Sequence, residues 1–106
     1  MDKAMRMVRI YLSEADQGRK HNLIDEIMAL LHDQHRVHGV TVFRGIAGFG
    51  SKGTVRAADL LRLTQHLPVV IEFFDETDNV DAALRALGDL VPSAHIVSWP
   101  VVCHIK

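Results

Sequence analysis

Residues 40–54 read Val40-Thr41-Val42-Phe43-Arg44-Gly45-Ile46-Ala47-Gly48-Phe49-Gly50-Ser51-Lys52-Gly53-Thr54. The first four residues are β-branched or aromatic, which favours a strand, expected over residues 40–46. Four of the seven glycines of the chain then follow within nine residues. Glycine has no Cβ, so a loop of this composition can bring its backbone N–H groups close to an anion. The stretch therefore predicts a strand that leads into an anion-binding loop or a plain turn.

The composition indicates one globular domain, residues 1–106, with an apolar fraction of 48% and a formal net charge of -1. This charge provides neither a basic field for nucleic acid nor an acidic tail. Cys103 is the single cysteine, which excludes an intramolecular disulfide and favours a reducing compartment. No signal peptide and no apolar run long enough to span a bilayer is recognisable. We therefore expect a soluble cytoplasmic protein that does not insert into membranes.

Three further strands and two helices are expected outside the opening stretch. Alternating side chains predict a strand over residues 8–13, and apolar runs predict strands over residues 69–74 and 95–105. The strand over residues 69–74 is expected to be central in the sheet. Pro100 interrupts the last strand and indicates a sheet edge or a bulge. Asn22 and Asp78 are the expected N-caps of the two helices, and Gly39 is the expected end of the first.

The order of these elements allows two topologies. If residues 54–65 form only a loop, the chain is a ferredoxin-like βαββαβ fold of the α+β class, with a four-stranded antiparallel sheet. If those residues form a crossover helix, three βαβ units would build a small parallel sheet.

The glycine-rich loop also matches a dinucleotide-binding pattern, G-x-G-x-x-G, from Gly48 to Gly53. Asp75, 22 residues after Gly53, stands where an acid would hold a ribose hydroxyl. That pattern normally opens its fold, whereas here a strand and a helix precede it, so a dinucleotide site is the weaker hypothesis. A Walker A loop is excluded, because Lys52 follows Ser51 and no Gly-Lys-Ser/Thr occurs.

Three histidines, His32, His35 and His38, lie three residues apart around the end of the first expected helix. His32 and His35 could share a helix face and bind a metal ion with Asp33. Alternatively, the histidines favour the negative end of the helix dipole and stay solvated.

Three other side chains carry structural expectations. Glu72 lies in an apolar strand and needs a partner if it is buried, for which Arg44 is the candidate. Trp99 is expected either at a subunit interface or in the core of one chain. Cys103 is expected to be a core or interface residue, because no histidine–acid pair that would activate a nucleophile is recognisable near it.

The chain resembles the PII-like signalling proteins, and within them the uncharacterised branch called domain of unknown function 190. The resemblance extends from about residue 8 to residue 102. Three segments carry it: Ile10-Tyr11-Leu12-Ser13-Glu14, the run from Gly39 to Gly50, and Leu67-Pro68-Val69-Val70-Ile71-Glu72.

This resemblance implies a ferredoxin-like βαββαβ fold assembled as a homotrimer, and a regulatory protein that is not an enzyme. In PII proteins the long loop after Gly-Phe-Gly is the T-loop, which responds to adenine nucleotides bound between subunits and docks onto a transporter, channel or enzyme. The corresponding segment here is residues 49–66. The implied nucleotide or anion site consists of Gly48, Phe49, Gly50, Ser51, Lys52 and Gly53.

The chain departs from the PII pattern before its last strand. PII proteins carry there a second phosphate loop, Thr-Gly-x-x-Gly-Asp-Gly-Lys, whereas residues 90–95 contain neither glycine nor lysine. Half of the triphosphate site is therefore missing. The resemblance then implies a smaller effector, such as AMP, a cyclic nucleotide or an inorganic anion, or none. The alternative function is a trimeric metal-binding protein that uses His32, His35 and His38.

Overall fold

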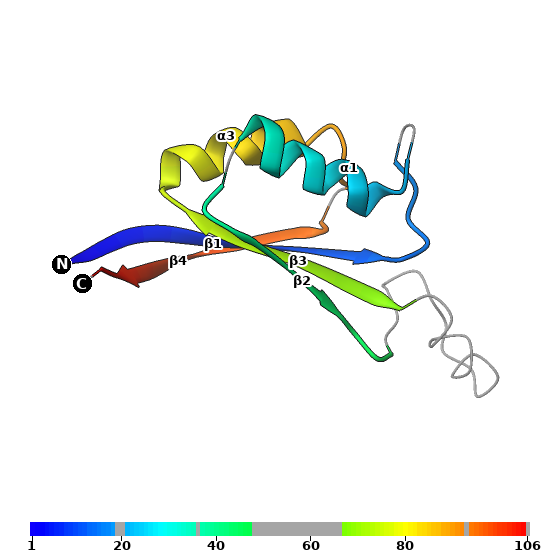
Figure 1. The fold of residues 1–106 in the computed structure, drawn as a ribbon, viewed down its shortest axis with the longest axis horizontal. Helices are drawn as coiled ribbons and strands as arrows, with labels where there is room; N and C mark the ends of the chain where they lie inside the picture. Colours follow the sequence, from blue (N-terminus) through cyan, green and yellow to red (C-terminus); the bar gives the residue numbers. More distant parts are fainter. Residues whose placement is uncertain (19–20, 36, 48–66, 93, 106) are drawn as a thin grey trace.

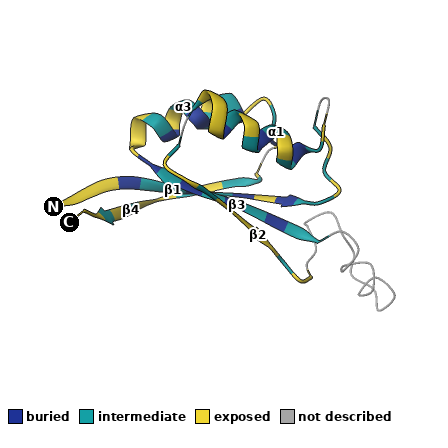
Figure 2. Cartoon of the chain, viewed as in Figure 1, coloured by how far each residue is buried: buried dark blue, intermediate teal, exposed yellow. Residues whose placement is uncertain are grey.

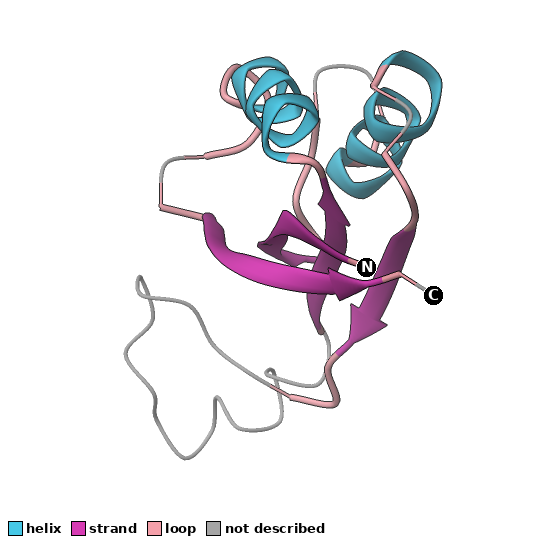
Figure 3. Cartoon of the chain, turned by 90° about the vertical axis from the view of Figure 1, so that its left-hand side faces the viewer, coloured by secondary structure: helices cyan, strands magenta, loops and turns pink. Residues whose placement is uncertain are grey.

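The structure is a computed structural model in which two helices lie side by side on one face of a four-stranded sheet (Figures 1 and 3). It describes residues 1–18, 21–35, 37–47, 67–92 and 94–105. The elements along the chain are β1 (Asp2–Ser13), α1 (Leu23–Ala29), η1 (Leu30–Gln34), β2 (Val40–Arg44), β3 (Pro68–Asp75), α3 (Thr77–Leu87) and β4 (Ile96–His104). The predicted helix over residues 54–65 lies outside the described residues.

The strand order in the sheet is β2-β3-β1-β4, and every neighbouring pair is antiparallel. This confirms the ferredoxin-like α+β topology and shows that the alternative, a parallel sheet of βαβ units, is wrong. The prediction that residues 69–74 form a central strand is also confirmed. β4 is an edge strand, which accommodates Pro100, because an edge strand can have a residue without an N–H donor.

The core lies between the helices and the face of the sheet that they cover (Figure 2). Side chains alternate between the two faces of a strand, and residues paired across neighbouring strands share a face. The central strands accordingly bury every second residue. The buried apolar side chains that pack together in this core are Val8, Ile10, Leu12, Leu23, Ile27, Leu31, Val69, Ile71, Phe73, Val80, Ala83, Leu87 and Val91.

The opposite face of the sheet is covered by no element of the described chain (Figures 1 and 3). We call it the open face. By strand register it carries Lys3, Met5, Met7, Arg9, Tyr11, Thr41, Phe43, Val70, Glu72, Phe74, Val97, Trp99, Val101 and Cys103. Tyr11, Phe43, Val97 and Trp99 are among the large apolar side chains that remain exposed.

The first helical segment begins as predicted and ends differently. The Asn22 side chain accepts a hydrogen bond of 2.9 Å from the Ile24 N–H, which confirms the N-cap. After Ala29 the helix widens into a π-turn, and the His35 N–H donates to the carbonyl of Leu30. The segment ends near His35, so the prediction that Gly39 ends the helix is wrong. The residues that directly follow Leu31 are polar, and the next apolar side chain that packs against the core is that of Val37.

The second helix begins earlier than predicted. Glu76 is the N-cap residue of α3, and Asp78 lies in the first turn of the helix, so the prediction of an Asp78 cap is wrong. Asp78 still favours the positive end of the helix dipole.

Candidate functional site

The six residues predicted to bind a nucleotide or anion, Gly48 to Gly53, lie outside the described residues, as do residues 54–66 of the predicted T-loop. The structure does describe the residues that follow β2 and those at the start of β3, on either side of this segment. We call these flanking residues, Glu14, Arg44, Gly45, Leu67 and Pro68, the loop root.

Gly45 and Pro68 are in close contact in the loop root. The Gly45 N–H donates to the Pro68 carbonyl at 2.8 Å, one step beyond the β2–β3 ladder. A Cβ atom placed on Gly45 would lie 2.6 Å from Pro68 Cγ, which is too close for two carbon atoms. The two chain segments approach so closely here because residue 45 has no side chain.

Arg44 links β2 to the end of β1. Its Nε and Nη2 groups donate to the two carboxylate oxygens of Glu14 at 2.7 and 2.8 Å, a bidentate geometry. The hydrogen bond to Glu14 raises the pKa of Arg44 above its ordinary value, with a further contribution from the carboxylate charge. The Glu14 N–H in turn donates to the Leu67 carbonyl at 3.0 Å. The segments on both sides of residues 48–66 are therefore tied to each other and to β1.

Glu72 is paired with Arg9, so the prediction that Arg44 is its partner is wrong. Arg9 and Glu72 are directly opposite in the β1–β3 register, and Arg9 Nε donates to Glu72 Oε2 at 2.6 Å. This hydrogen bond, followed by one to Tyr11, raises the pKa of Arg9. The Arg9 guanidinium also lies 5.5 Å from the ring centroid of Trp99, a cation–π distance. The open face thus has an aromatic and charged centre, and Trp99 is not a core residue.

The histidines do not converge on one site in the described chain. His32 is exposed and contacts Asp33, with 2.7 Å between Nδ1 and Oδ1. His35 lies at the end of the π-turn. A π-turn has more residues per turn than an α-helix, so the spacing that would place His32 and His35 on one face of an α-helix does not apply here. His38 contacts Asp75 instead. Within residues 1–18, 21–35, 37–47, 67–92 and 94–105, no three His, Cys, Asp or Glu side chains are grouped to hold a metal ion.

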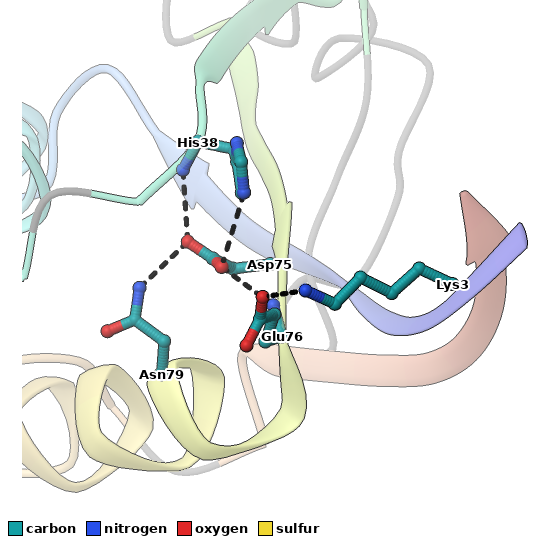
Figure 4. Close-up of polar contacts among 5 residues, drawn as sticks. All are labelled: Lys3, His38, Asp75, Glu76 and Asn79. Carbon is teal, nitrogen blue, oxygen red and sulfur yellow. Dashed lines mark hydrogen bonds and ion pairs between the residues drawn. The ribbon is translucent and has the colours of Figure 1, made fainter. Parts of the chain in front are cut away.

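Asp75, which the dinucleotide hypothesis placed against a ribose hydroxyl, lies in a polar cluster at the end of β3 (Figure 4). Its side chain is buried, and it accepts hydrogen bonds from the backbone N–H groups of His38 and Glu76 and from the Asn79 side chain, at 3.1, 2.7 and 2.7 Å. Glu76 also pairs with Lys3 of β1. Asp75 therefore joins the start of β2, the end of β3 and the start of α3. In the sequence, the position of this acid directly between an apolar strand and a helical pattern is the signal that could have indicated such a structural role.

The turn before β4 is where the resemblance to PII proteins would imply a second phosphate loop. Ala94 has a φ of 67°, the left-handed conformation that glycine favours. The His95 ring then donates from Nδ1 to the Tyr11 carbonyl at 2.7 Å, and the Tyr11 N–H donates to the His95 carbonyl at 2.9 Å. The chain therefore reverses at Ala94 without a glycine, and the two hydrogen bonds between His95 and Tyr11 attach this turn to β1.

Two further predictions concern accessibility. Cys103 is a free thiol of intermediate exposure in β4. None of the helices in the described part of the chain combines the length and the apolar character needed to cross a bilayer.

Comparison with known proteins agrees with this geometry. The family model DUF190, described as an uncharacterised conserved family, matches residues 5–103, so the chain belongs to this family. A UPF0166 protein of Methanocaldococcus jannaschii is 32% identical over 100 residues, which cover 94% of this chain and 90% of the relative.

Solved structures show the same fold at low sequence identity. CPII of Thiomonas intermedia K12, a nitrogen regulatory PII-like protein bound to ADP, AMP and bicarbonate, superposes with a TM-score of 0.63 at 15% identity and covers 100% of this chain and 99% of CPII. The divalent ion tolerance protein CutA1 of Ehrlichia chaffeensis superposes with a TM-score of 0.60 at 9% identity, covering 96% of this chain and 83% of CutA1. The fold is therefore that of the PII-like proteins, and it also occurs in CutA1.

Proposed function

We propose that this protein is a PII-like regulator, without enzymatic activity, that senses a small effector between the subunits of a homotrimer. The effector is an adenine nucleotide or an inorganic anion. The segment of residues 49–66 responds to it and binds or releases a partner such as a transporter, channel or enzyme. This is a population shift, in which the effector prefers one conformation of that segment.

The observation that carries the proposal is the loop root. In a PII-like fold, a glycine-rich segment of 19 residues, 48–66, begins and ends at two tied strands. A signal that acts on such a segment needs fixed attachment points, because otherwise effector binding would also loosen the sheet. The ADP, AMP and bicarbonate bound by CPII, a protein of the same fold, suggest the class of effector.

The open face supports the trimer. Tyr11, Phe43, Val97 and Trp99 expose apolar surface on a sheet face that no described element covers. Apolar patches of this kind mark interaction sites. The Arg9–Glu72 pair at its centre would then be desolvated and would favour one arrangement of the subunits.

Calorimetric titration of chelator-treated protein tests the proposed sensing. The titrants are AMP, ADP, ATP, cyclic AMP, bicarbonate and NADH. We expect saturable binding of an adenine nucleotide or of bicarbonate that Gly50→Ala and Lys52→Ala weaken, while Gly39→Ala leaves it unchanged. Binding of NADH alone would instead support the dinucleotide hypothesis. The absence of binding across the whole panel would refute the sensing of these effectors and leave only the fold and the family.

A further inference from the structure

A groove separates the two helices on the solvent side of the helical layer. It has a volume of about 390 Å³ and lies between α1 with its π-turn and the C-terminal end of α3. Eight residues line it: Glu26, Ala29, Leu30, Asp33, Gln34, Ala86, Asp89 and Leu90. The groove is on the face of the molecule opposite to the open face, because the helices cover the other side of the sheet (Figure 3).

The floor of the groove is apolar. Leu30 and Leu90 pack against the hydrophobic core with part of their surface and remain partly accessible with the rest. Ala29 and Ala86 are small, which leaves space between the two helices. An apolar side chain of a ligand could therefore lie between Leu30 and Leu90, where it would lose contact with water.

The rim of the groove is acidic. Three of the eight lining residues, Glu26, Asp33 and Asp89, carry carboxylates, and none of the eight is lysine or arginine. The C-terminal end of α3 adds the partial negative charge of a helix terminus. Among the described residues, His32 contacts Asp33, with 2.7 Å between Nδ1 and Oδ1. Charge complementarity thus favours a cationic ligand.

Glu26 has an unsatisfied oxygen in the described structure. Its Oε2 atom is buried and accepts no hydrogen bond. The carboxylate fills the space beside Gly18, where a Cβ atom would come within 1.2 Å of Oε2. A buried carboxylate oxygen without a donor is costly, and this one packs against Gly18, so Glu26 contributes to the acidic rim through its charge and not through this atom.

We propose that this groove is a docking site for a basic amphipathic segment of a partner protein. Apolar side chains of the segment would occupy the floor, and its Lys or Arg side chains would pair with Glu26, Asp33 and Asp89. The site lies on the helical layer and shares no residue with the loop root, so it is independent of effector sensing.

A designed probe tests the proposal. The probe is a fluorescently labelled 16-residue helical peptide with leucines on one face and lysines on the other, measured by fluorescence anisotropy and by amide NMR shifts. Two variants with the same change in charge are compared: Asp33→Asn with Asp89→Asn, and Asp78→Asn with Asp81→Asn. Asp78 and Asp81 are exposed on α3 and do not line the groove.

We expect the first pair of substitutions to weaken binding roughly tenfold, and the second pair less than about twofold, as distant exposed charges contribute little. The largest amide shifts should fall on residues 26–34 and 86–90. Ala29→Trp, which fills the groove from an exposed position, should also abolish binding. Unfolding in urea checks that each variant is folded.

Four outcomes would overturn the proposal. Equal losses in the two charge pairs would show attraction to the overall charge only. Amide shifts elsewhere, or binding that survives Ala29→Trp, would place the probe outside the groove. A change of self-association in the groove variants, measured by sedimentation, would show that a second copy of the chain covers this surface.

Discussion

The Asp75 carboxylate is buried, and three hydrogen-bond donors compensate for the water that it loses on folding. The His38 and Glu76 N–H groups and the Asn79 amide supply them. We predict that Asp75→Asn lowers the free energy of unfolding by about 2–3 kcal/mol, because the asparagine NH₂ cannot accept hydrogen bonds and faces other donors. Urea unfolding measures the change.

The matched control for this substitution is Asp81→Ala. Asp81 is exposed on α3, and its removal should change the free energy of unfolding by less than about 0.5 kcal/mol. If Asp75→Asn were as mild as this control, the cluster in Figure 4 would not hold the three elements together.

Two glycines differ in what a methyl group would meet. The added Cβ of Gly45→Ala would lie 2.6 Å from the rigid Pro68 ring, whereas at Gly39 no atom lies within 4 Å. Neither glycine has a positive φ. We predict that Gly45→Ala lowers the free energy of unfolding by about 1–3 kcal/mol. Gly39→Ala should raise it by up to about 1 kcal/mol, because it restricts the unfolded chain.

Thermal unfolding of the two alanine variants makes this comparison. A Gly45→Ala variant as stable as the Gly39→Ala variant would mean that β2 and β3 do not approach as closely as the structure shows.

At the scale of elements, Arg44 couples β2 to β1 rather than adding much stability. The Arg44 side chain of this ion pair is exposed and Glu14 is partly exposed, so Arg44→Ala should cost less than about 1 kcal/mol. We predict that Arg44→Ala makes amide hydrogen exchange faster at Gly45 and Glu14. These two N–H groups donate to the carbonyls of Pro68 and Leu67 in the loop root. Arg85→Ala, an exposed position on α3, is the control and should leave these amides unchanged.

The strands were predictable from the sequence because burial follows a period of two residues. In β1 the alternation of Val8, Ile10 and Leu12 with Arg9 and Tyr11 is visible without a structure, whereas β3 was predicted from its apolar run and shows its alternating burial only in the structure. The partner of Glu72 was not predictable in this way. Pairing depends on strand register, and Arg9 is its neighbour only because β1 is inserted beside β3 with residues 9 and 72 opposite each other.

The helix ends were less predictable than the helices. Glycine is common directly after a helix, as at Gly39, but here the helix widens into a π-turn after Ala29 and ends earlier. Asp78 is a residue type that often caps a helix, but here Glu76 is the N-cap residue, and its N–H donates to the Asp75 side chain. Local sequence indicates which residues can cap a helix, whereas tertiary packing decides which of them does so. For residues 48–53 the anion-binding hypothesis stays a prediction.

For the whole molecule, two valines of β4 distinguish the faces of the sheet. By register Val97 lies on the open face beside Arg9, and Val102 lies on the opposite side beside Ala4; both are exposed. We predict that Val97→Glu converts the proposed trimer into monomers at micromolar concentration, since a charge would be buried without a partner. Val102→Glu should leave the trimer intact.

Sedimentation velocity of the two variants measures their assembly. A wild-type chain that sediments as a monomer would refute the trimer, and dissociation by both substitutions would place the interface elsewhere than on the open face.

The pairing of β1 with β4 brings the first and the last described residues together. The Met1 amino group donates to the Ile105 carbonyl at 2.7 Å, and the Ile105 N–H donates to the Met1 carbonyl at 3.0 Å, and both ends lie at the same corner of the molecule (Figure 1). A short linker between them would close the polypeptide into a ring without disturbing the sheet. The chain could then be opened at a new position, such as between Gly88 and Asp89, where α3 has ended. In such a circular permutant the chain ends would lie after α3, where a reporter dye could be attached.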